Sequence, residues 1–424
     1  QKKQYACWDD KELIRNKIKN IFPKSKFIKI DKVKFNNYDN VYLTPGISIF
    51  DKRFNKVSKL KIKRDLNLYL KNLNQEKIIA ITGTNGKSTS VKLVGEIIKK
   101  KYKKTFIGGN IGDALCNSLT IKNKYTHHVI ELSSFQLEAI KNIESKISVL
   151  LNLSKDHLDR YKNFNDYIKT KKNIFNLGNN SINIISTDDI FSQKIFKDKK
   201  IKNKISFSIK NFKSDIYYNN GYIYDKYFYK LKKIKLVNIS SDLSNSYNMQ
   251  SILVAYIICK YFNIPIKLFR EEVKNFKGLP FRSSVIFESN NKIIINNSKA
   301  TNISSAITSL ENKKNVYLIL GGIAKEKNYK ALNKFKKIIK QIYIFGSSRN
   351  LIKKQITVNI KSKVFKNLEE IIDEVFKDIS FLNAKATIVF SPACASFDQF
   401  KNFEDRGKFF NKLINEKIKK NEYI

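Results

Sequence analysis

The chain has 424 residues, of which 42% are hydrophobic and 12% aromatic. This supply of apolar side chains can build packed cores in about two to four domains and excludes a globally disordered protein. The formal net charge of +45 would suit a protein that binds nucleic acid. Lysine, however, is spread along the whole chain together with much Asn, Ile, Tyr and Phe. We therefore interpret the charge as a general bias in composition and expect no specific nucleic-acid partner.

Neither a membrane span nor a secretory signal is visible in the sequence. No apolar run reaches the roughly 18 residues that a membrane helix needs, and the start lacks the pattern of a signal peptide. The cysteines are scattered without metal-binding or redox spacing, at Cys7, Cys116, Cys259 and Cys394. This is usual in a reducing compartment. We expect a cytoplasmic protein, and we expect it to be a monomer.

Residues 1–70 have the pattern of a small α/β unit. A strand is expected at 5–8, a helix from Glu12 onward and a second strand at 41–43. Apolar residues in short runs between polar turns support this assignment. The unit is too small to be the whole functional protein.

Acidic and turn residues follow the two strands of this unit. Asp9 and Asp10 come after the first strand, and a turn at Thr44–Gly46 closes the second. Positions past the ends of parallel strands lie at the sheet edge where ligands bind. No glycine-rich dinucleotide-type loop precedes Asp9, and the chain starts at Gln1. We therefore expect this unit to be truncated at its N-terminus.

The start of the next section has the pattern of a phosphate-binding loop. The β-branched apolar run at 78–81 predicts a buried parallel strand. Gly83 and Gly86 interrupt the run, and helical spacing begins at Lys87. A strand that leads through a glycine loop into a helix directs backbone N–H groups and the positive helix end to one point, where anions bind. Lys87 adds a full positive charge there.

The match to the standard loop is incomplete. Gly83 and Gly86 lie closer together than the standard spacing, and Ile81 stands where the first glycine belongs. A tight turn before an ordinary helix is therefore the alternative. The agreement of strand, loop and helix, with Ser88 or Thr89 to supply the hydroxyl for Mg²⁺, favours an ATP phosphate site.

Two further strands of the middle section, 71–278, end in polar residues. Glu131 ends a strand that begins near residue 128, and His157 follows a strand at 147–153. A second flexible turn is expected at Gly108–Gly112. Parallel strands with polar residues at one edge are typical of a doubly wound α/β sheet.

Two of these polar residues are candidates for metal binding. A carboxylate at Glu131 can hold Mg²⁺ beside ATP phosphates; the less favoured alternative is a helix N-cap. His157 could be a ligand or an ordinary hydrogen-bonded histidine. On charge grounds, Lys171 on the following helix is an unexpected neighbour for a metal.

The third section, 279–424, begins after a linker at 278–280 and again predicts a parallel sheet. Its expected strands lie at 292–295, 316–320, 342–345 and 386–390. Cationic and hydroxyl side chains follow the strand ends, and these could bind anions and a carboxylate across a cleft. They are Arg282, Lys299, Thr301, Lys325 and Ser396. Cys394 has no matched histidine and is expected to be a small buried residue.

Several runs of residues resemble a known family. The run Thr82–Thr89 resembles the nucleotide loop of Mur ligases and folylpolyglutamate synthases, which are ATP-dependent amide ligases. Further runs resemble the D-glutamate-adding Mur ligases in particular. These runs are Glu131–Glu138, Asp156–Tyr161, Ser298–Asn302 and Ser391–Phe403. The resemblance spans nearly the whole chain, and the Asp-Asn-Pro-Arg tetrapeptide of the diaminopimelate- or lysine-adding relatives is absent.

The resemblance implies a three-domain α/β enzyme of peptidoglycan synthesis. The N-terminal domain would be Rossmann-like (1–70), the central one a P-loop ATPase-like parallel sheet (71–278) and the C-terminal one Rossmann-like (279–424). ATP would phosphorylate the terminal carboxylate of UDP-N-acetylmuramoyl-L-alanine, and the amine of D-glutamate would attack the acyl phosphate. Mg²⁺ and lysines must neutralise both anions before transfer.

The resemblance also implies a role for individual residues. The nucleotide would contact Gly83, Thr84, Asn85, Gly86, Lys87, Ser88, Thr89, Asn248, Arg282 and Asn297. Ser88 and Glu131 would hold one Mg²⁺, and His157 would hold a second together with a carbamylated Lys171, whose register Tyr167 fixes. The muramoyl substrate would contact Asn110, and uridine would dock near Asp9, Asp10 and Gly46. D-Glutamate would lie against Thr301, Lys325, Ser396 and Phe403, and the catalytic set is Lys87, His157 and Lys171.

Three positions depart from the family pattern. Asn297 replaces an Asp that contacts ribose, Tyr247 replaces a His, and Ile323 replaces an Asp. These changes suit either a truncated working enzyme or a chain under relaxed selection. Another amide ligase of the superfamily, a basic nucleic-acid-binding P-loop ATPase and a silent binder of a nucleotide sugar remain as alternatives.

Overall fold

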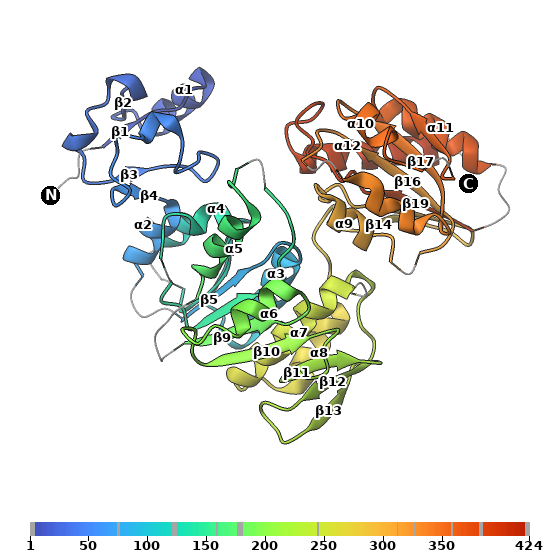
Figure 1. Ribbon diagram of the computed structural model, residues 1–424, viewed down its shortest axis with the longest axis horizontal. Coiled ribbons are helices and arrows are strands. Elements are labelled where there is room, and N and C mark those ends of the chain that lie inside the picture. The colour runs from blue at the N-terminus through green and yellow to red at the C-terminus, as the bar shows by residue number, and fades with distance from the viewer. Residues whose placement is uncertain are drawn as a thin grey trace.

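The computed structural model describes residues 5–73, 77–120, 125–141, 143–157, 160–175, 181–243, 246–311, 313–325, 328–357, 359–380 and 385–419. Its described residues form an α/β protein with a 9-stranded sheet, a 6-stranded sheet and two 2-stranded sheets. Figure 1 shows the N-terminal pairs of strands in blue, the large sheet in light blue through green to yellow, and the C-terminal sheet in orange to red. The predicted multi-domain α/β class is confirmed. The domain limits at 70/71 and 278/279 stay a prediction.

The N-terminal region contains two short parallel pairs of strands. Its elements are β1 (Ala6–Cys7), α1 (Glu12–Ile21), β2 (Lys26–Phe27), β3 (Val41–Tyr42), β4 (Ile62–Lys63) and α2 (Asp65–Lys71). β1 pairs with β2 and β3 with β4. The helix that was predicted from Glu12 is confirmed. The region's own core is small and consists of Leu43, Phe54, Val57 and Ile62.

The large sheet has the strand order β13-β12-β11-β10-β9-β8-β5-β7-β6. Its strands are β5 (Lys77–Thr82), β6 (Thr105–Gly109), β7 (His127–Glu131), β8 (Ile147–Leu150), β9 (Ile182–Ser186), β10 (Lys204–Ser208), β11 (Ile216–Asn219), β12 (Tyr222–Asp225) and β13 (Lys232–Lys235). Strands β5, β7 and β8 are neighbours and parallel. The polar residues that follow them therefore meet at one edge, as predicted.

Both faces of this sheet are covered by helices. Ile79 and Ile81 of β5 pack with α3 (Lys87–Lys101), α7 (Ser246–Tyr261) and α8 (Ile266–Asn275). Ile78 and Ala80 pack on the opposite face. That face carries α2, α4 (Ser134–Leu137), α5 (Phe164–Lys172) and α6 (Ile190–Phe196). The apolar run at 78–81 is therefore buried on both sides, as is usual for a central parallel strand.

Glycine shapes two places in this section. The antiparallel pair β11–β12 turns at Asn220 and Gly221, whose φ values are 46° and 82°. Positive φ at both turn residues is typical of a type I′ hairpin, which Asn-Gly favours. The flexible turn expected from Gly108 is wrong in part, because Gly108 and Gly109 belong to β6. A side chain at Gly109 would lie 2.4 Å from the Glu131 carbonyl oxygen, so glycine is needed there for close strand pairing.

The C-terminal region is a 6-stranded sheet with the order β14-β15-β19-β16-β17-β18. Its strands are β14 (Ser284–Glu288), β15 (Lys292–Asn296), β16 (Val316–Gly321), β17 (Ile339–Phe345), β18 (Ser362–Val364) and β19 (Ala386–Phe390). Its helices are α9 (Ile303–Thr308), α10 (Arg349–Lys353), α11 (Leu368–Ser380) and α12 (Phe403–Lys419). β14 pairs antiparallel, and the remaining pairs are parallel.

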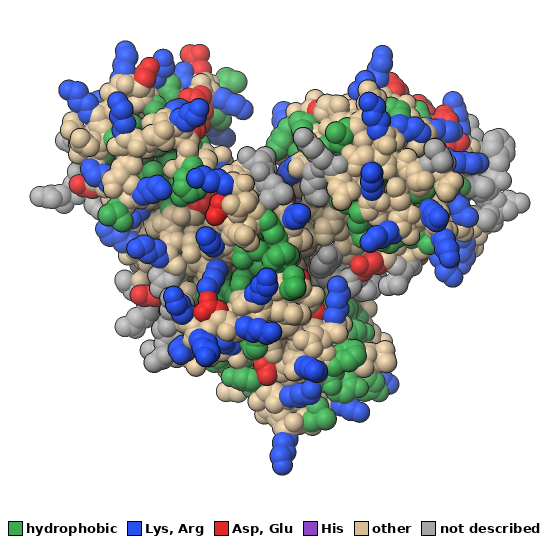
Figure 2. All heavy atoms as spheres, in the orientation of Figure 1, with side chains coloured by type: hydrophobic (Ala, Val, Ile, Leu, Met, Phe, Trp, Pro, Cys, Tyr) green, Lys and Arg blue, Asp and Glu red, His purple; other side chains and the backbone are tan. Residues whose placement is uncertain are grey.

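Within the described residues, no helix is long and apolar enough to cross a membrane. The charged surface in Figure 2 carries Lys and Arg side chains over all three regions, with fewer acidic groups between them. This distribution agrees with a general compositional bias. On the surface that Figure 2 shows, the basic side chains do not gather in one patch.

Candidate active site

The loop between β5 and α3 has the geometry of an anion cradle. Gly86 is the N-cap of α3 with φ 79°, and no side chain caps the helix there. A side chain at Gly83 would place its Cβ 2.9 Å from the Cβ of Leu151. The first N–H groups of α3 therefore have no side-chain acceptor, and a bound phosphate would satisfy them.

Neighbouring side chains hold this loop in place. The Asn152 side chain accepts from the Asn85 N–H at 2.9 Å and donates to the Asn85 carbonyl at 3.1 Å. The Thr84 hydroxyl lies 3.1 Å from the Tyr167 hydroxyl. The loop is thus fixed by β8 and α5 before any ligand binds, which reduces the entropy cost of binding.

A cavity of about 310 Å³ opens between the phosphate loop and the C-terminal region. Gly86, His157 and Lys325, which belong to three different strand ends, all line it. The other predicted site residues that line it are Thr84, Asn85, Lys87, Ser88, Thr89, Asn110, Glu131, Lys171, Asn248, Arg282, Asn297 and Thr301. The structure therefore brings most of the predicted site together.

The remaining predicted residues lie elsewhere among the described ones. The Asp10 carboxylate accepts from Trp8 and Arg53 in the N-terminal region, near Asp9. Gly46 also belongs to that region, and its carbonyl accepts from Arg160. The cavity lining does not include these three residues, nor Gly83, Ser396 or Phe403.

Two lysine side chains lie in the cavity wall beside the loop. Lys87 Nζ donates to the Thr84 carbonyl at 2.8 Å, and Lys171 Nζ donates to the Gly83 carbonyl at 2.8 Å. Burial lowers the pKa of Lys87, and it lowers the pKa of Lys171 to well below the ordinary value. Removal from water disfavours the charged ammonium form, and the two lysines also repel each other.

One carboxylate oxygen of Glu131 accepts a hydrogen bond, and the other has no partner. Its Oε1 accepts from the Asn110 side chain at 2.9 Å, while its buried Oε2 has no hydrogen-bond partner. The N-cap of α4 is Ser133, whose capping box with Gln136 satisfies the helix start. The alternative interpretation of Glu131 as an N-cap is therefore wrong. An orphaned carboxylate oxygen that faces a cavity is suited to a cation.

His157 occupies a strained turn at the cavity. Its φ is 53°, in the left-handed region that a non-glycine residue rarely adopts. Its Nε2 lies 3.6 Å from the Asp156 carboxylate, and burial lowers its pKa to about 4. The ring is therefore neutral at pH 7 and available as a ligand or an acceptor.

The described residues include no group of three or more His, Cys, Asp and Glu side chains that could hold a metal alone. A Mg²⁺ site does not need such a group, because Mg²⁺ is usually bound by one or two carboxylates together with substrate phosphates and water. The orphaned oxygen of Glu131 beside an open phosphate cradle fits that kind of site. Ser88 would add a hydroxyl, although its Oγ accepts from Arg282 in this structure.

The C-terminal region supplies further charge to the cavity. Burial lowers the pKa of Lys299 to about 7, and its Nζ lies 3.7 Å from the centre of the Phe403 ring. Asn297 donates to the Ser391 hydroxyl at 3.0 Å and accepts from the Ser283 N–H at 3.1 Å. Its amide thus bonds to the segments before β14 and after β19.

Some contacts across the cavity were not foreseen from the sequence. The Ser305 hydroxyl donates to the Asn85 side chain at 2.9 Å, and Asn302 donates to Asp156 at 3.4 Å. The first bond joins α9 to the phosphate loop, and the second joins the N-cap of α9 to the segment after β8. Asp156 stood beside His157 in a recognisable run, but Ser305 carried no signal because its partner is 220 residues away.

Comparison with known proteins places the chain in a family. Residues 81–259 match the Mur ligase middle domain. The chain is 33% identical over 418 residues to UDP-N-acetylmuramoylalanine--D-glutamate ligase of Rickettsia bellii, covering 96% of this chain and 92% of the relative. It is 36% identical over 418 residues to the enzyme of the same name from Buchnera aphidicola subsp. Schizaphis graminum, covering 96% and 91%.

The fold is also similar to solved structures. The crystal structure of MurF ligase from Thermotoga maritima in complex with ADP has a TM-score of 0.63 at 16% identity and covers 92% of this chain and 97% of that one. At that identity the likeness concerns the fold alone. The sequence relatives, with the cavity and its phosphate loop, decide the family: this chain belongs to the UDP-N-acetylmuramoylalanine--D-glutamate ligases, a branch of the Mur ligases.

Proposed function

We propose that this protein is an ATP-dependent ligase that joins D-glutamate to UDP-N-acetylmuramoyl-L-alanine through an acyl phosphate in peptidoglycan synthesis. The observation that carries the proposal is the shared cavity of Lys87, His157 and Lys325. A carboxylate and a triphosphate repel each other, and this cavity offers them cations from two sheets.

The protein's own groups suggest how the transfer is promoted. The N–H groups at the start of α3 and Lys87 would hold the phosphates of ATP, and Arg282 would approach them from the other sheet. The carboxylate oxygen of the muramoyl substrate would attack the terminal phosphorus, and ADP would leave. The amine of D-glutamate would then attack the acyl carbon, and phosphate would leave with the substrate oxygen.

Mg²⁺ would supply charge neutralisation and in-line geometry when bound. Ser88 and Glu131 would hold one ion. His157 and Lys171 would hold a second one, provided that Lys171 is carbamylated. Burial favours the neutral Lys171 amine, which is the form that adds to CO₂ and loses a proton. The product is an anionic oxygen ligand in place of the amine.

Substrate contacts follow from the same assignment. Asn110 would contact the muramoyl group, and Asn248 and Asn297 the nucleoside of ATP. The docking region for uridine would lie near Asp9, Asp10 and Gly46. D-Glutamate would lie against Thr301, Lys325, Ser396 and Phe403, which belong to the C-terminal region. We keep 1–70, 71–278 and 279–424 as the domain limits, with a monomer in the cytoplasm.

An ADP-release assay with a panel of acceptors tests this proposal. ATP and UDP-N-acetylmuramoyl-L-alanine are supplied with D-glutamate, L-glutamate, meso-diaminopimelate or L-lysine. We expect turnover with D-glutamate only. Turnover with a folate and L-glutamate would instead indicate a folylpolyglutamate-type ligase. ATPase activity that responds to polynucleotide and not to these substrates would indicate a nucleic-acid-dependent ATPase.

A further inference from the structure

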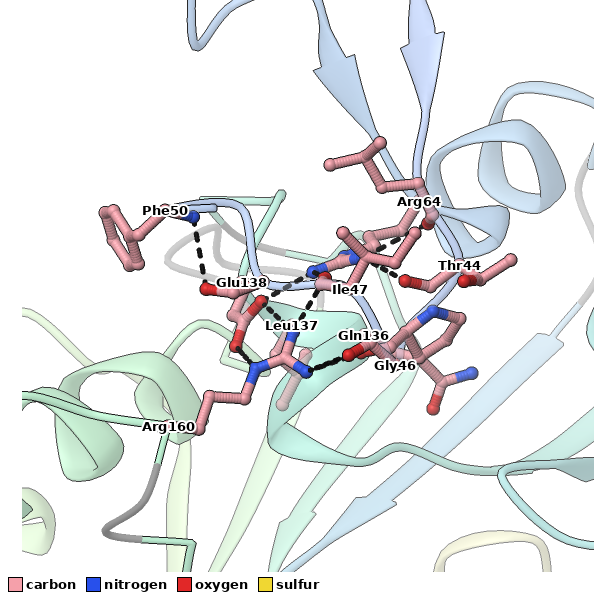
Figure 3. Close-up of polar contacts among 12 residues, drawn as sticks. Thr44, Gly46, Ile47, Phe50, Arg64, Gln136, Leu137, Glu138 and Arg160 are labelled. Carbon is pink, nitrogen blue, oxygen red and sulfur yellow. Dashed lines mark hydrogen bonds and ion pairs between the residues drawn. The ribbon is translucent and has the colours of Figure 1, made fainter. Parts of the chain in front are cut away.

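Two arginines enclose one carboxylate where the N-terminal region meets the central sheet (Figure 3). Arg64 Nη2 donates to Glu138 Oε2 at 2.6 Å. Arg160 donates to the same carboxylate through Nε at 2.8 Å and Nη2 at 2.7 Å. The side chains of Arg64, Glu138 and Arg160 are 0%, 2% and 9% exposed. We call these three residues the clamp.

The clamp holds one loop of the N-terminal region by its carbonyl groups. Arg64 donates to the carbonyls of residues 43, 44 and 47 at 3.1, 2.5 and 2.8 Å. Arg160 donates to those of residues 45, 46 and 47 at 2.7, 3.2 and 3.0 Å. The carbonyl group of each residue from 43 to 47 therefore accepts from an arginine. We call this segment the clamped loop. Buried backbone carbonyl groups need donors, so these bonds favour one conformation of the loop.

The clamp carries two positive charges and one negative charge with little access to water. Buried ions are tolerated only where hydrogen bonds complete their solvation. Here the carbonyl groups of the clamped loop accept from the terminal nitrogens of both guanidinium groups, while the buried Nε of Arg64 has no hydrogen-bond partner. The position of the loop and the charge balance of the clamp are therefore linked.

Arg160 also supports the wall of the cavity. Its guanidinium lies 3.9 Å from the centre of the Phe135 ring, and that ring packs edge-on against His157 with centres 4.7 Å apart. The Arg160 N–H donates to the His157 carbonyl at 3.0 Å. Phe135 and His157 both line the cavity. One side chain thus contacts the clamped loop and the ring that packs on His157.

Two further hydrogen bonds accompany the clamp. Asn67 of α2 donates to the Ala139 carbonyl at 3.2 Å, and Gln136 of α4 donates to Asp65 at 3.3 Å. These bonds bring α2 onto α4 but reach neither the clamped loop nor the cavity. Among these described contacts, the clamp is the one that joins the clamped loop to the cavity wall.

We propose that Glu138 and Arg160 are positioning residues that fix the distance between the clamped loop and the cavity wall at Phe135 and His157. The inference rests on the proposed function, in which the uridine end of the muramoyl substrate docks near Gly46 and its carboxylate reacts in the cavity. A substrate that binds at two points gains affinity only when the separation of the points matches its length. In this proposal only the muramoyl substrate spans the clamped loop and the cavity, so loss of the clamp should weaken the binding of this substrate more than that of ATP or D-glutamate.

Steady-state kinetics of Glu138→Gln test the proposal. The amide keeps the shape of the carboxylate but loses its charge. We expect the KM for UDP-N-acetylmuramoyl-L-alanine to rise about tenfold or more, as for the loss of charge-assisted hydrogen bonds. The KM values for ATP and D-glutamate should stay within about twofold of the wild-type values. Equal changes in all three KM values, or none, would overturn the proposal.

A matched control separates positioning from general loss of stability. Asp225 is fully buried in β12 and accepts from the Tyr256 hydroxyl at 2.6 Å, far along the sheet from the clamp. Asp225→Asn therefore removes a comparable buried charge. We expect all three KM values of this variant to match wild type. A selective rise for the muramoyl substrate in this control would contradict the assignment to the clamp.

A second pair of variants keeps the proposal testable if Glu138→Gln does not fold. Arg160→Lys retains the charge but loses the two-pronged geometry, and Arg160→Met loses both. The KM for the muramoyl substrate should rank wild type, Arg160→Lys, Arg160→Met in rising order. The same KM for both variants as for wild type would count against positioning.

The wild-type protein separates the two proposals. If it releases no ADP with these substrates, the proposed function fails. The clamp is then examined by calorimetry, with UDP-N-acetylmuramoyl-L-alanine titrated into wild type and Glu138→Gln. Binding about tenfold weaker in the variant supports the clamp, and equal binding, or none in either protein, overturns it.

Discussion

Lys171 donates to the Gly83 carbonyl, 2.8 Å away, and so lies against the first turn of the phosphate loop. It is 1% exposed, whereas its neighbour Lys172 points away from the cavity and forms an ion pair with Asp198. Helix geometry rotates successive residues by about 100°, so only one of the two lysines can face the cavity. Tyr167, four residues earlier, lies on the same side, with its ring centre 5.0 Å from Lys171 Nζ.

This arrangement predicts unequal effects at the two lysines. Lys171→Ala should reduce kcat by at least about a hundredfold, because it removes the anionic ligand proposed for the second Mg²⁺. Lys172→Ala should leave kcat within about twofold, since its exposed ion pair contributes little. ADP-release kinetics at saturating bicarbonate measure both. Equal activity of the two variants would contradict the assignment.

A second prediction concerns the lysine of the phosphate loop. Lys87→Ala should abolish phosphate release, because one full charge beside the transferring group is lost, and the cost should be on the order of 3–4 kcal/mol in activation energy. Far-UV circular dichroism should remain unchanged. Lys99→Ala, on the exposed side of the same helix, serves as the control and should keep wild-type turnover.

His157→Ala should likewise abolish turnover while the protein stays folded. The ring is neutral at pH 7 because burial lowers its pKa to about 4, so the variant removes a ligand and not a charge. Single-turnover phosphate release measures the loss. Turnover close to that of wild type would exclude His157 from the site.

Because of the two histidines of β7, we expect the free energy of unfolding to fall below neutral pH. Burial lowers the pKa of both His127 and His128 from 6.5 to about 4. Between these values the unfolded chain binds protons that the folded chain does not, so the free energy of unfolding falls as the pH drops from 6.5 towards 4. Each histidine contributes on the order of 3 kcal/mol to this fall. Urea unfolding at pH 7, 6, 5 and 4 measures it.

A variant identifies the source of that slope. The His127 ring stacks on Tyr102 with centres 3.9 Å apart. His127→Phe keeps an aromatic ring there and removes the titrating group, so the pH dependence should become shallower. An unchanged slope would mean that other groups control acid stability.

Replacement of Asn297 by aspartate is expected to raise the affinity for ATP. The side chain accepts from the Ser283 N–H, and an aspartate would keep that bond while adding the carboxylate that the family pattern places against ribose. Asn297→Asp should therefore lower the KM for ATP, by up to about tenfold. A higher KM would show that the Ser391 hydroxyl bond is the more important feature of this position.

The parts of the fold that the sequence predicted are those with local patterns. The run at 78–81 and the helix from Lys87 follow from apolar spacing alone, and both are confirmed. β14 and β18 were missed because these short edge strands are partly exposed, and they lack the long buried run of a central strand. The predicted strand at 147–153 ends at Leu150, and Asn152 beyond it bonds to Asn85 of the phosphate loop.

Prediction of the site was limited by distance along the chain. Glu131 and His157 follow strands of one sheet, so parallel topology alone brings them to one edge. Arg64 and Glu138 are 74 residues apart and belong to different regions, and no local pattern pairs them. Family resemblance supplied roles for single residues, but it did not reveal that Arg160 links the clamped loop to Phe135.

The most direct test of the central claim follows an oxygen atom. UDP-N-acetylmuramoyl-L-alanine labelled with ¹⁸O in its terminal carboxylate is turned over with ATP and D-glutamate, and the released phosphate is analysed by mass spectrometry. If the cavity transfers phosphate to the carboxylate, one labelled oxygen leaves with each phosphate. Phosphate without label, formed at the same rate as ADP, would contradict the acyl-phosphate account.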